Sequence, residues 1–249
     1  MSQLVFKQPE SIKPDYTFNF CPGCDHGVAI RIVAEVLDEL ECRDKTLMAA
    51  SVGCSVFGYD YFNIDVVESP HGRAPAVATG MKRVMPEHTV FTYQGDGDAA
   101  SIGLTELVHS AVRGERITVI CINNTNFGMT GGQAGPTTIP GQKTTTTPYG
   151  KDTHEIGFPM KISEMIALCQ GAAFVARGSL DSPSAIKNAK KLVKRAFEVQ
   201  HQDLGFGFVE LLSSCPTNWH KHPREAHKWV KNILYPVFPL GILKNTTAE

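Results

Sequence analysis

The sequence predicts an α/β fold with a mainly parallel sheet and helices on both faces. Segments rich in β-branched and aromatic residues alternate along the chain with amphipathic, helix-like segments. The strand-like segments, such as ITVICIN at 117–123, are apolar without interruption, which is typical of parallel strands buried on both faces. Glycine-rich turns follow several strands, and in such folds the ligand lies at the carboxyl ends of the strands.

The helices follow from the spacing of apolar residues and from their end signals. Val28, Ile32 and Val36 recur at helical spacing, a second helix ends before Gly114, and Ser182 with the next proline opens another. In chain order we expect a helix at 28–40, a strand at 46–51, a helix within 71–84, a strand at 89–94, a helix at 102–113, a strand at 117–123, a helix at 162–169, a strand at 174–177, a helix from 182 to about 197 and a strand at 208–212. The segment 124–158 is rich in Gly, Thr and Pro, and a loop of this length is usually functional or disordered.

Composition excludes several classes of protein. The 249 residues carry 24 Lys+Arg and 25 Asp+Glu, so binding to nucleic acid by broad phosphate neutralisation is not expected. No run reaches the roughly 18 to 20 apolar residues of a membrane span, and the start lacks the pattern of a signal peptide, so we expect a cytoplasmic protein. Seven cysteines in such a chain indicate metal or cluster ligation rather than disulfides.

The whole chain, 1–249, is expected to form a single domain, because there is no repeat, linker or change of composition. Its last part, 221–249, is predicted to be a C-terminal tail that contacts another subunit. Trp229, Tyr235, Phe238 and Leu240 are expected to be exposed there and to suit such a contact.

Two polar motifs follow neighbouring strands and are expected at the same edge of the sheet. GDGD occupies Gly95 to Asp98, and Asn124 follows the next strand, 28 residues after Asp96. Asp96 and Asn124 can supply two of the hard oxygen ligands that Mg²⁺ prefers, and a main-chain carbonyl just past the asparagines can supply a third. Gly95 and Gly97 would let the backbone approach a diphosphate, and the helix beginning near residue 100 would point its amides at it. Taken alone, GDG is more often only a tight turn.

CPGC places Cys21 and Cys24 two residues apart, a spacing at which both can bind one centre. Two further ligands are needed, and Cys54 and Cys215 are expected in loops at the sheet edge. Cys42, Cys121 and Cys169 are expected to be structural. A zinc site has the same requirement for four thiolates, so the spacing alone leaves zinc and an iron-sulfur cluster open.

The combination of motifs resembles one family along nearly the whole chain. CPGC, VGCS, HGRAPAVATG, GDGD, NN with GMTGGQ, and CPTNW are similar in type and order to those of the β subunits of 2-oxoacid:ferredoxin oxidoreductases. The resemblance implies the thiamine-diphosphate-binding fold, with Mg²⁺ on Asp96, Asn124 and the carbonyl of Asn126. It implies a 4Fe-4S cluster on Cys21, Cys24, Cys54 and Cys215. The cofactor-contact residues that it implies are Gly95, Asp96, Gly97, Asp98, Asn124, Asn126, Gly128, Met129 and Thr130, and the catalytic candidates are His71, Arg73 and Thr130. For His71, a structural role at a helix start is an equal alternative.

The same resemblance implies partners and a reaction. A partner α subunit would carry the pyrimidine-binding domain and its Glu, and γ and ferredoxin-like δ subunits can belong to the complex. The reaction would be oxidative decarboxylation of a 2-oxoacid to its acyl-CoA, with electrons passing through the cluster to ferredoxin. A non-redox thiamine-diphosphate decarboxylase subunit and a zinc-stabilised nucleotide-binding protein are the alternatives.

The sequence departs from the family pattern at two places. Asp25 stands where relatives commonly have a small residue, and Asn126-Phe127 replaces an aliphatic residue and Tyr. The resemblance also puts Phe57 near the substrate side chain, which would suit a branched-chain or aryl 2-oxoacid. A 2-oxoglutarate pocket would need a cation, for which Arg73, Lys143 or the α subunit are the candidates.

Overall fold

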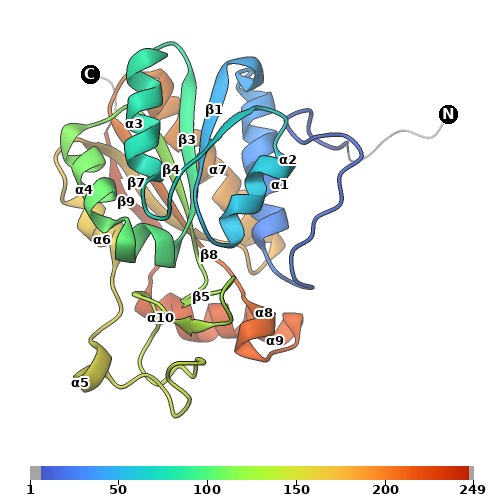
Figure 1. Cartoon of the computed structure of the whole chain (residues 1–249), viewed down its shortest axis with the longest axis vertical. Helices are drawn as coiled ribbons and strands as arrows, with labels where there is room; N and C mark the ends of the chain where they lie inside the picture. The colour runs from blue at the N-terminus through green and yellow to red at the C-terminus, as the bar shows by residue number, and fades with distance from the viewer. Residues whose placement is uncertain (1–6, 247–249) are drawn as a thin grey trace.

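The computed structural model describes residues 7–246 and contains one seven-stranded sheet of order β2-β1-β3-β4-β8-β7-β9 (Figure 1). All neighbouring strands are parallel except β9, which pairs antiparallel with β7. The strands are β1 Thr46–Ala50, β2 Asp65–Glu68, β3 Thr89–Gly95, β4 Thr118–Asn123, β7 Ala172–Ser179, β8 Phe206–Leu212 and β9 Gly241–Asn245, and a two-stranded ribbon joins β5 Asn126–Phe127 to β6 Gln133–Ala134.

Helices cover both faces of the sheet, as predicted. Helices α1 and α7 pack on one face, and α3, α4 and α6 pack on the other. The helices are α1 His26–Glu39, α2 Gly58–Tyr61, α3 Ala74–Val84, α4 Leu104–Arg113, α5 Thr153–Ile156, α6 Ile162–Ala167, α7 Pro183–His201, α8 Pro216–Trp219, α9 Pro223–Trp229 and α10 Tyr235–Val237, with 3-10 turns η1 Arg43–Lys45 and η2 Cys54–Phe57 and π-helical turns η3 Asp98–Ile102 and η4 Val230–Leu234. None of the helices within the described part of the chain is long and apolar enough to cross a membrane.

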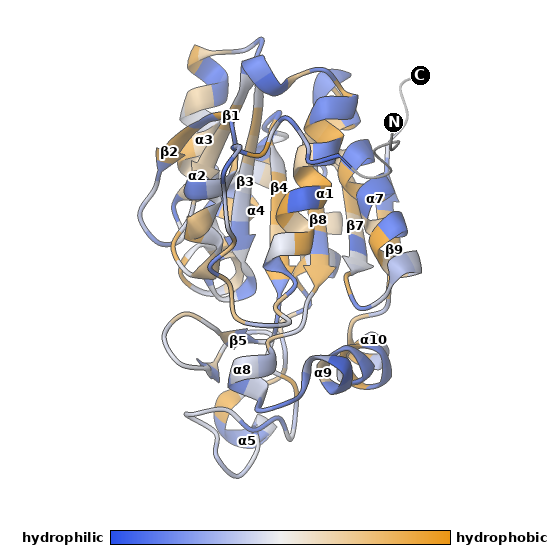
Figure 2. Cartoon of the chain, turned by 90° about the vertical axis from the view of Figure 1, so that its right-hand side faces the viewer, coloured by the Kyte–Doolittle hydropathy of each residue, from blue (hydrophilic) through white to orange (hydrophobic). Residues whose placement is uncertain are grey.

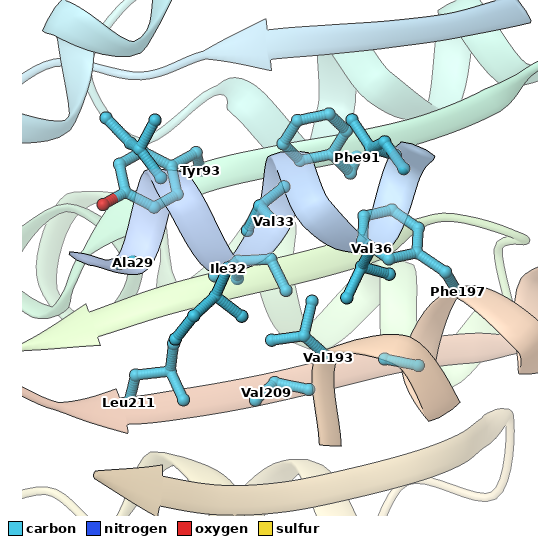
Figure 3. Packing of buried hydrophobic residues seen from close by; sticks show 14 of the residues in the cluster. Ala29, Ile32, Val33, Val36, Phe91, Tyr93, Val193, Phe197, Val209 and Leu211 are labelled. Atoms are coloured by element: carbon cyan, nitrogen blue, oxygen red, sulfur yellow. The ribbon is translucent and has the colours of Figure 1, made fainter. Parts of the chain in front are cut away.

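Helix α1 shows how the apolar periodicity becomes a core. Its residues Ala29, Ile32, Val33 and Val36 face the strands and α7, and all four are buried (Figure 3). They pack against side chains of β3, β8 and α7, which Figure 3 labels as Phe91, Tyr93, Val193, Phe197, Val209 and Leu211. Burial of apolar surface, at roughly 25 cal/mol per Å², therefore holds α1 in place on the sheet.

Every strand and helix expected from the sequence is found at its predicted place, but two strands of the seven-stranded sheet, β2 and β9, and the short ribbon of β5 and β6 were not predicted. Strand β2 lies at an edge and is largely exposed, so its DVVE sequence lacks the continuous apolar pattern of a buried strand. Strand β9 lies at the other edge and is also largely exposed.

The expectation that the aromatic residues of the tail are exposed is wrong for Phe238. Its ring is fully buried and packs in a cluster with Leu212, Trp219 and Leu234, while Trp229, Tyr235 and Leu240 are partly buried against that cluster. The tail therefore packs on its own chain, because α9 to α10 cover the carboxyl end of β8 and β9 extends the sheet. Residues 247–249 lie outside the described residues, and a further contact of the tail with a partner stays a prediction.

The carboxyl ends of β1, β3, β4 and β8 meet at one edge of the sheet, and the loops gather there. In Figures 1 and 2, β5, α5, α8, α9 and α10 lie beyond this edge, below the strands. Helix α1 runs antiparallel to the strands that follow it, so its first turn, with the CPGC segment, reaches the same edge. The fold thus brings the motifs of the sequence together at this edge.

Buried charges connect the centre of the sheet to this edge. The guanidinium of Arg177 in β7 donates to Glu210 Oε2 of β8 at 2.8 Å, and both side chains are fully buried. Glu210 Oε1 accepts from the Asn123 amide at 2.6 Å, and Asn123 Oδ1 accepts from the Thr125 main chain at 3.0 Å. Hydrogen bonds from this buried network, through Asn123 to the main chain of Thr125, therefore hold the start of the loop that begins with Asn124.

Candidate functional site

A cavity opens at the carboxyl edge, between the loops that follow β1, β3 and β4. Its lining includes His26 at the start of α1, the turn at 52–55, His71, the GDGD turn at 95–98, and residues 124 and 126–130. The Ser55 hydroxyl in this lining is buried and has no hydrogen-bond partner in the described structure. An orphaned buried hydroxyl at a cavity wall is the arrangement expected where a polar ligand completes the site.

Three residues bring oxygen atoms together in this cavity. The Asn124 amide oxygen lies 3.2 Å from Asp96 Oδ1, 2.8 Å from the main-chain oxygen of Asn126 and 3.0 Å from Asn126 Oδ1. Adjacent ligands of Mg²⁺, each about 2.0–2.1 Å from the ion in octahedral geometry, lie about 3 Å apart. If the Asn124 amide is rotated by 180°, its nitrogen donates hydrogen bonds to the same three oxygens. The oxygens therefore have a hydrogen-bond donor when no cation is bound and can face a cation when one is bound. The donor set and its spacing therefore fit Mg²⁺.

The charge of Asp96 makes a cation favourable here. Asp96 is buried, and burial raises the pKa of its carboxyl to about 7, although hydrogen bonds from the Thr137 hydroxyl and the Asn124 main chain act in the opposite direction. A bound divalent cation stabilises the ionised form of such a carboxyl.

Asp98 is a buried anchor rather than a free ligand. Its Oδ2 accepts from the Ser51 hydroxyl and the Gln94 amide, each at 2.5 Å, and its Oδ1 accepts from the Gly72 main chain at 2.7 Å. The same Oδ1 is hydrogen-bonded to His71 Nδ1, so four donors occupy the carboxylate. Asp98 therefore fixes the orientation of the His71 ring at the cavity wall, and the contact with the cofactor that was expected of Asp98 stays a prediction.

The glycines of the GDGD turn serve different purposes. A Cβ at Gly97 would lie 2.4 Å from the Phe127 ring, so Gly97 leaves room for that ring. At Gly95 a Cβ would meet nothing within 4 Å, which leaves the backbone open to a ligand. The GDGD turn continues into the π-helical turn η3, which precedes α4. The helical segment whose main-chain amides were expected to begin near residue 100 therefore begins at Asp98. Short π-helical turns occur often at functional sites.

Arg73 is not among the residues that line the cavity, and its catalytic role stays a prediction. It precedes the first residue of α3, and its side chain pairs with Glu106 of α4, away from the lining residues. Lys143 is exposed and also lies outside the lining, whereas Gly128, Met129 and Thr130 are part of it. The Thr130 hydroxyl donates to Gln133 Oε1 at 2.6 Å.

The placement of Phe57 beside the substrate is not supported either. The Phe57 ring lies edge-on to Phe20, with the ring centroids 6.0 Å apart, and packs on the apolar core under α1. Phe57 is not among the lining residues because η2 turns its side chain toward that core.

Cys21 and Cys24 precede α1, Cys54 begins η2 and Cys215 precedes α8, all at the carboxyl edge, and ionisation of one thiol disfavours ionisation of the others. Burial raises the pKa of the Cys24 thiol well above its usual range, and Cys215 and Cys54 add to the shift. Burial also raises the pKa of Cys54, to about 11, with Cys215 and Cys21 adding to it. Cys54 lines the cavity.

The other three thiols have separate environments. Cys121 is buried inside β4, Cys42 donates to the Leu37 carbonyl at 3.6 Å, and Cys169 donates to the Met165 carbonyl at 3.8 Å. Within residues 7–246, no three Cys, His, Asp or Glu side chains converge closely enough to hold a single metal ion.

His26 is a site residue that the sequence interpretation missed. It lines the cavity, is buried, and its Nδ1 lies 2.8 Å from the Tyr93 hydroxyl of β3. Its ring stacks on Phe20, with the centroids 5.0 Å apart, and burial lowers the pKa of His26 to about 4, so the imidazole is neutral. The signal in the sequence was a histidine at the first position of an otherwise apolar helix face.

Gly72, which follows His71, is expected to be sensitive to substitution. Gly72 has φ +78°, and a Cβ there would lie 2.7 Å from the Gly103 nitrogen. We expect Gly72→Ala to lower the free energy of unfolding by about 2 kcal/mol or more in chemical denaturation, because neither backbone can yield. Gly80→Ala, inside α3 with nothing within 4 Å of the new Cβ, should instead stabilise the chain by about 0.5–1 kcal/mol. Equal losses for the two variants would contradict this account of Gly72.

Comparison with known proteins agrees with this geometry. The model of the thiamine pyrophosphate enzyme C-terminal TPP-binding domain matches residues 48–209. The chain is 41% identical over its full length to the ketoisovalerate oxidoreductase subunit VorA of Methanothermobacter thermautotrophicus, of which it spans about half (54%). It is 37% identical over 85% of its length to the 2-oxoglutarate synthase subunit KorB of Archaeoglobus fulgidus, of which it covers 75%.

A solved structure shares the fold. The 2-oxoglutarate:ferredoxin oxidoreductase of Magnetococcus marinus, with 2-oxoglutarate, coenzyme A and succinyl-CoA bound, superposes with a TM-score of 0.77 at 26% identity, covering 99% of this chain and 88% of that one. The mainly parallel sheet, the matched domain over β1 to β8 and these relatives agree. The chain therefore belongs to the thiamine pyrophosphate enzyme family, together with the subunits of 2-oxoacid oxidoreductases.

Proposed function

We propose that this chain is the β subunit of a 2-oxoacid:ferredoxin oxidoreductase. With a partner α subunit, it would oxidatively decarboxylate a 2-oxoacid to the acyl-CoA and pass electrons through a 4Fe-4S cluster to ferredoxin. The observation that carries the proposal is the set of oxygens from Asp96, Asn124 and Asn126, at the spacing of Mg²⁺ ligands, in a cavity that Cys54 also lines.

The residues of this chain would hold the cofactor and exclude water. Asp96, Asn124 and the carbonyl of Asn126 would bind Mg²⁺ and so anchor the diphosphate of thiamine diphosphate. When bound, thiamine diphosphate supplies a nucleophilic carbon for the 2-oxo group and a cationic ring that accepts the electron pair released with CO2. Asp98 holds the Nδ1 side of His71, which leaves the other ring nitrogen available to carry a proton at the cavity wall.

The spread of the described cysteine side chains supports the proposal of a cluster over that of a single zinc ion. A tetrathiolate zinc site requires all four sulfurs about 2.3 Å from one ion. Among the described side chains no such convergence occurs, although the four thiols interact electrostatically. A 4Fe-4S cluster distributes its four thiolates over separate irons, so it has no need of that convergence.

Two observations support the proposal of partner subunits, namely the chemistry of thiamine enzymes and the names of the relatives. Thiamine enzymes need a carboxylate beside the aminopyrimidine, which we expect from the Glu of the α subunit. The relatives VorA and KorB are themselves named as subunits. We expect γ and ferredoxin-like δ components to join the complex, which we place in the cytoplasm.

The first prediction of the proposed function concerns the oxygen ligands. Asp96→Ala and Asn124→Ala should each weaken binding of Mg-thiamine diphosphate by more than about a hundredfold and leave the iron content unchanged, because each removes an inner-shell ligand. Calorimetric titration of the anaerobically purified complex measures both affinities. Asp65→Ala, at an exposed position of β2, is the matched control. Stoichiometric cofactor in either site variant would refute the assignment.

The second prediction concerns the cluster. The anaerobically purified protein should be brown and should bleach on reduction, whereas a zinc protein or a plain decarboxylase is colourless. Serine in place of Cys21, Cys24, Cys54 or Cys215 should remove most of the iron, and serine at Cys42, Cys121 or Cys169 should not. Iron lost from the Cys121 or Cys169 variant, with the four ligand variants intact, would mean that the quartet was chosen wrongly.

The third prediction concerns the substrate. No lysine or arginine is present among the described lining residues, and Arg73 is already paired, so the described cavity wall offers no cation to the distal carboxylate of 2-oxoglutarate. Because an unpaired buried charge costs several kcal/mol, we expect a higher kcat/KM for 2-oxoisovalerate than for 2-oxoglutarate in the assembled complex. A preference for 2-oxoglutarate that survives Arg73→Ala and Lys143→Ala would instead assign selectivity to the α subunit.

A further inference from the structure

Asp25 follows Cys24 directly, yet its carboxylate is bonded to two segments from the other end of the chain. Its Oδ2 accepts from the Ser214 main chain at 2.7 Å, and its Oδ1 lies 2.8 Å from His227 Nε2 of α9. The Asp25 side chain is only 5% exposed, whereas His227 is 34% exposed. One buried carboxylate therefore joins the CPGC turn, the loop that carries Cys215 and the C-terminal segment.

We propose that Asp25 is a positioning residue for the cluster: it holds the CPGC turn against the loop of Cys215, and its charge lowers the reduction potential of the centre that these cysteines bind. His227 fixes the carboxylate from the side of α9. The inference rests on the proposed function, because it requires the cluster.

Contacts around Asp25 support the positioning role. The Ser214 hydroxyl donates to the Gly23 carbonyl at 3.0 Å, which is a second bond between the same two loops. Gly23 has φ +77°, and a Cβ there would lie 2.4 Å from the Pro223 ring at the start of α9. The turn is therefore enclosed between the Cys215 loop and α9, and Asp25 bonds to both.

The electrostatics support the second part of the proposal. The Asp25 carboxylate belongs to the residue next to Cys24, is only 5% exposed, and is held there by its bonds to Ser214 and His227. Reduction adds one negative charge to a cluster, and reduction potentials of iron-sulfur centres depend on nearby charge and hydrogen bonds. A carboxylate fixed beside the ligands should therefore make reduction harder.

Asp25→Asn tests the charge while preserving size and shape. In the complex purified anaerobically, we expect this variant to keep its iron and to show an upward shift of the cluster's midpoint potential in a spectroscopic redox titration. Asp44→Asn is the matched control, because it removes the same charge from an exposed side chain in η1, before β1, and should leave the potential unchanged. An Asp25→Asn potential equal to that of the wild type would overturn the electrostatic role.

Asp25→Ala and His227→Gln test the positioning role by iron analysis. We expect iron loss to be large for Asp25→Ala and smaller for His227→Gln, which leaves the Ser214 bond in place. Full iron content in both variants would overturn the positioning role. A wild-type complex without iron would overturn the proposed function and this inference with it, whereas an iron-containing wild type with unaffected variants would overturn the inference alone.

Discussion

The architecture of the site depends on one constraint, which is that parallel strands end at the same edge of the sheet. Because β1, β3, β4 and β8 are parallel neighbours, the turns after them meet although they lie far apart in the sequence. Helix α1 precedes β1 and runs in the opposite direction, so its first turn adds the CPGC segment to the same edge. Asp96, Asn124, Cys54 and Cys215 come together without any local sequence relation for this reason.

The buried carboxylates Asp98 and Glu210 near this edge are tolerated because each accepts several hydrogen bonds. Asp98 is shared by four donors, and Glu210 is held by Asn123, Ser163 and Arg177. An unpaired buried charge would cost several kcal/mol, so these networks are part of the fold as well as of the site. Asp96, by contrast, keeps a raised pKa, which marks it as the carboxylate that still favours a cation.

The parts that the sequence predicted are those with a repeating physical pattern. The apolar spacing of α1 and the uninterrupted strands β3 and β4 identify buried elements directly, and a polar residue at a strand end identifies Asp96 and Asn124 as site candidates. The sequence contains no comparable pattern that indicates the direction of a single side chain. The resemblance indicates that Arg73 and Phe57 lie near the substrate, whereas in the structure Arg73 pairs with Glu106 and Phe57 packs against Phe20, and neither lines the cavity. Phe238 was expected to be exposed because the strands that bury it, β7 and β8, lie earlier in the chain. No local sequence pattern indicates that the tail packs back onto them.

The two halves of the site share one wall, which is the segment from Asn126 to Gly128. The Asn218 amide donates to the Gly128 carbonyl at 2.8 Å and to Cys215 Sγ at 3.3 Å. Burial raises the pKa of this thiol, and hydrogen bonds from Asn218 and the Asn126 side chain act in the opposite direction. A Cβ at Gly128 would lie 3.3 Å from Cys54 Sγ, so this backbone passes directly beside a second thiol. Asn126 therefore contacts both groups of side chains, because its carbonyl faces the Asn124 oxygen and its side chain interacts with Cys215. Any shift of this segment that follows binding at the oxygen cluster must also move the environment of the thiols.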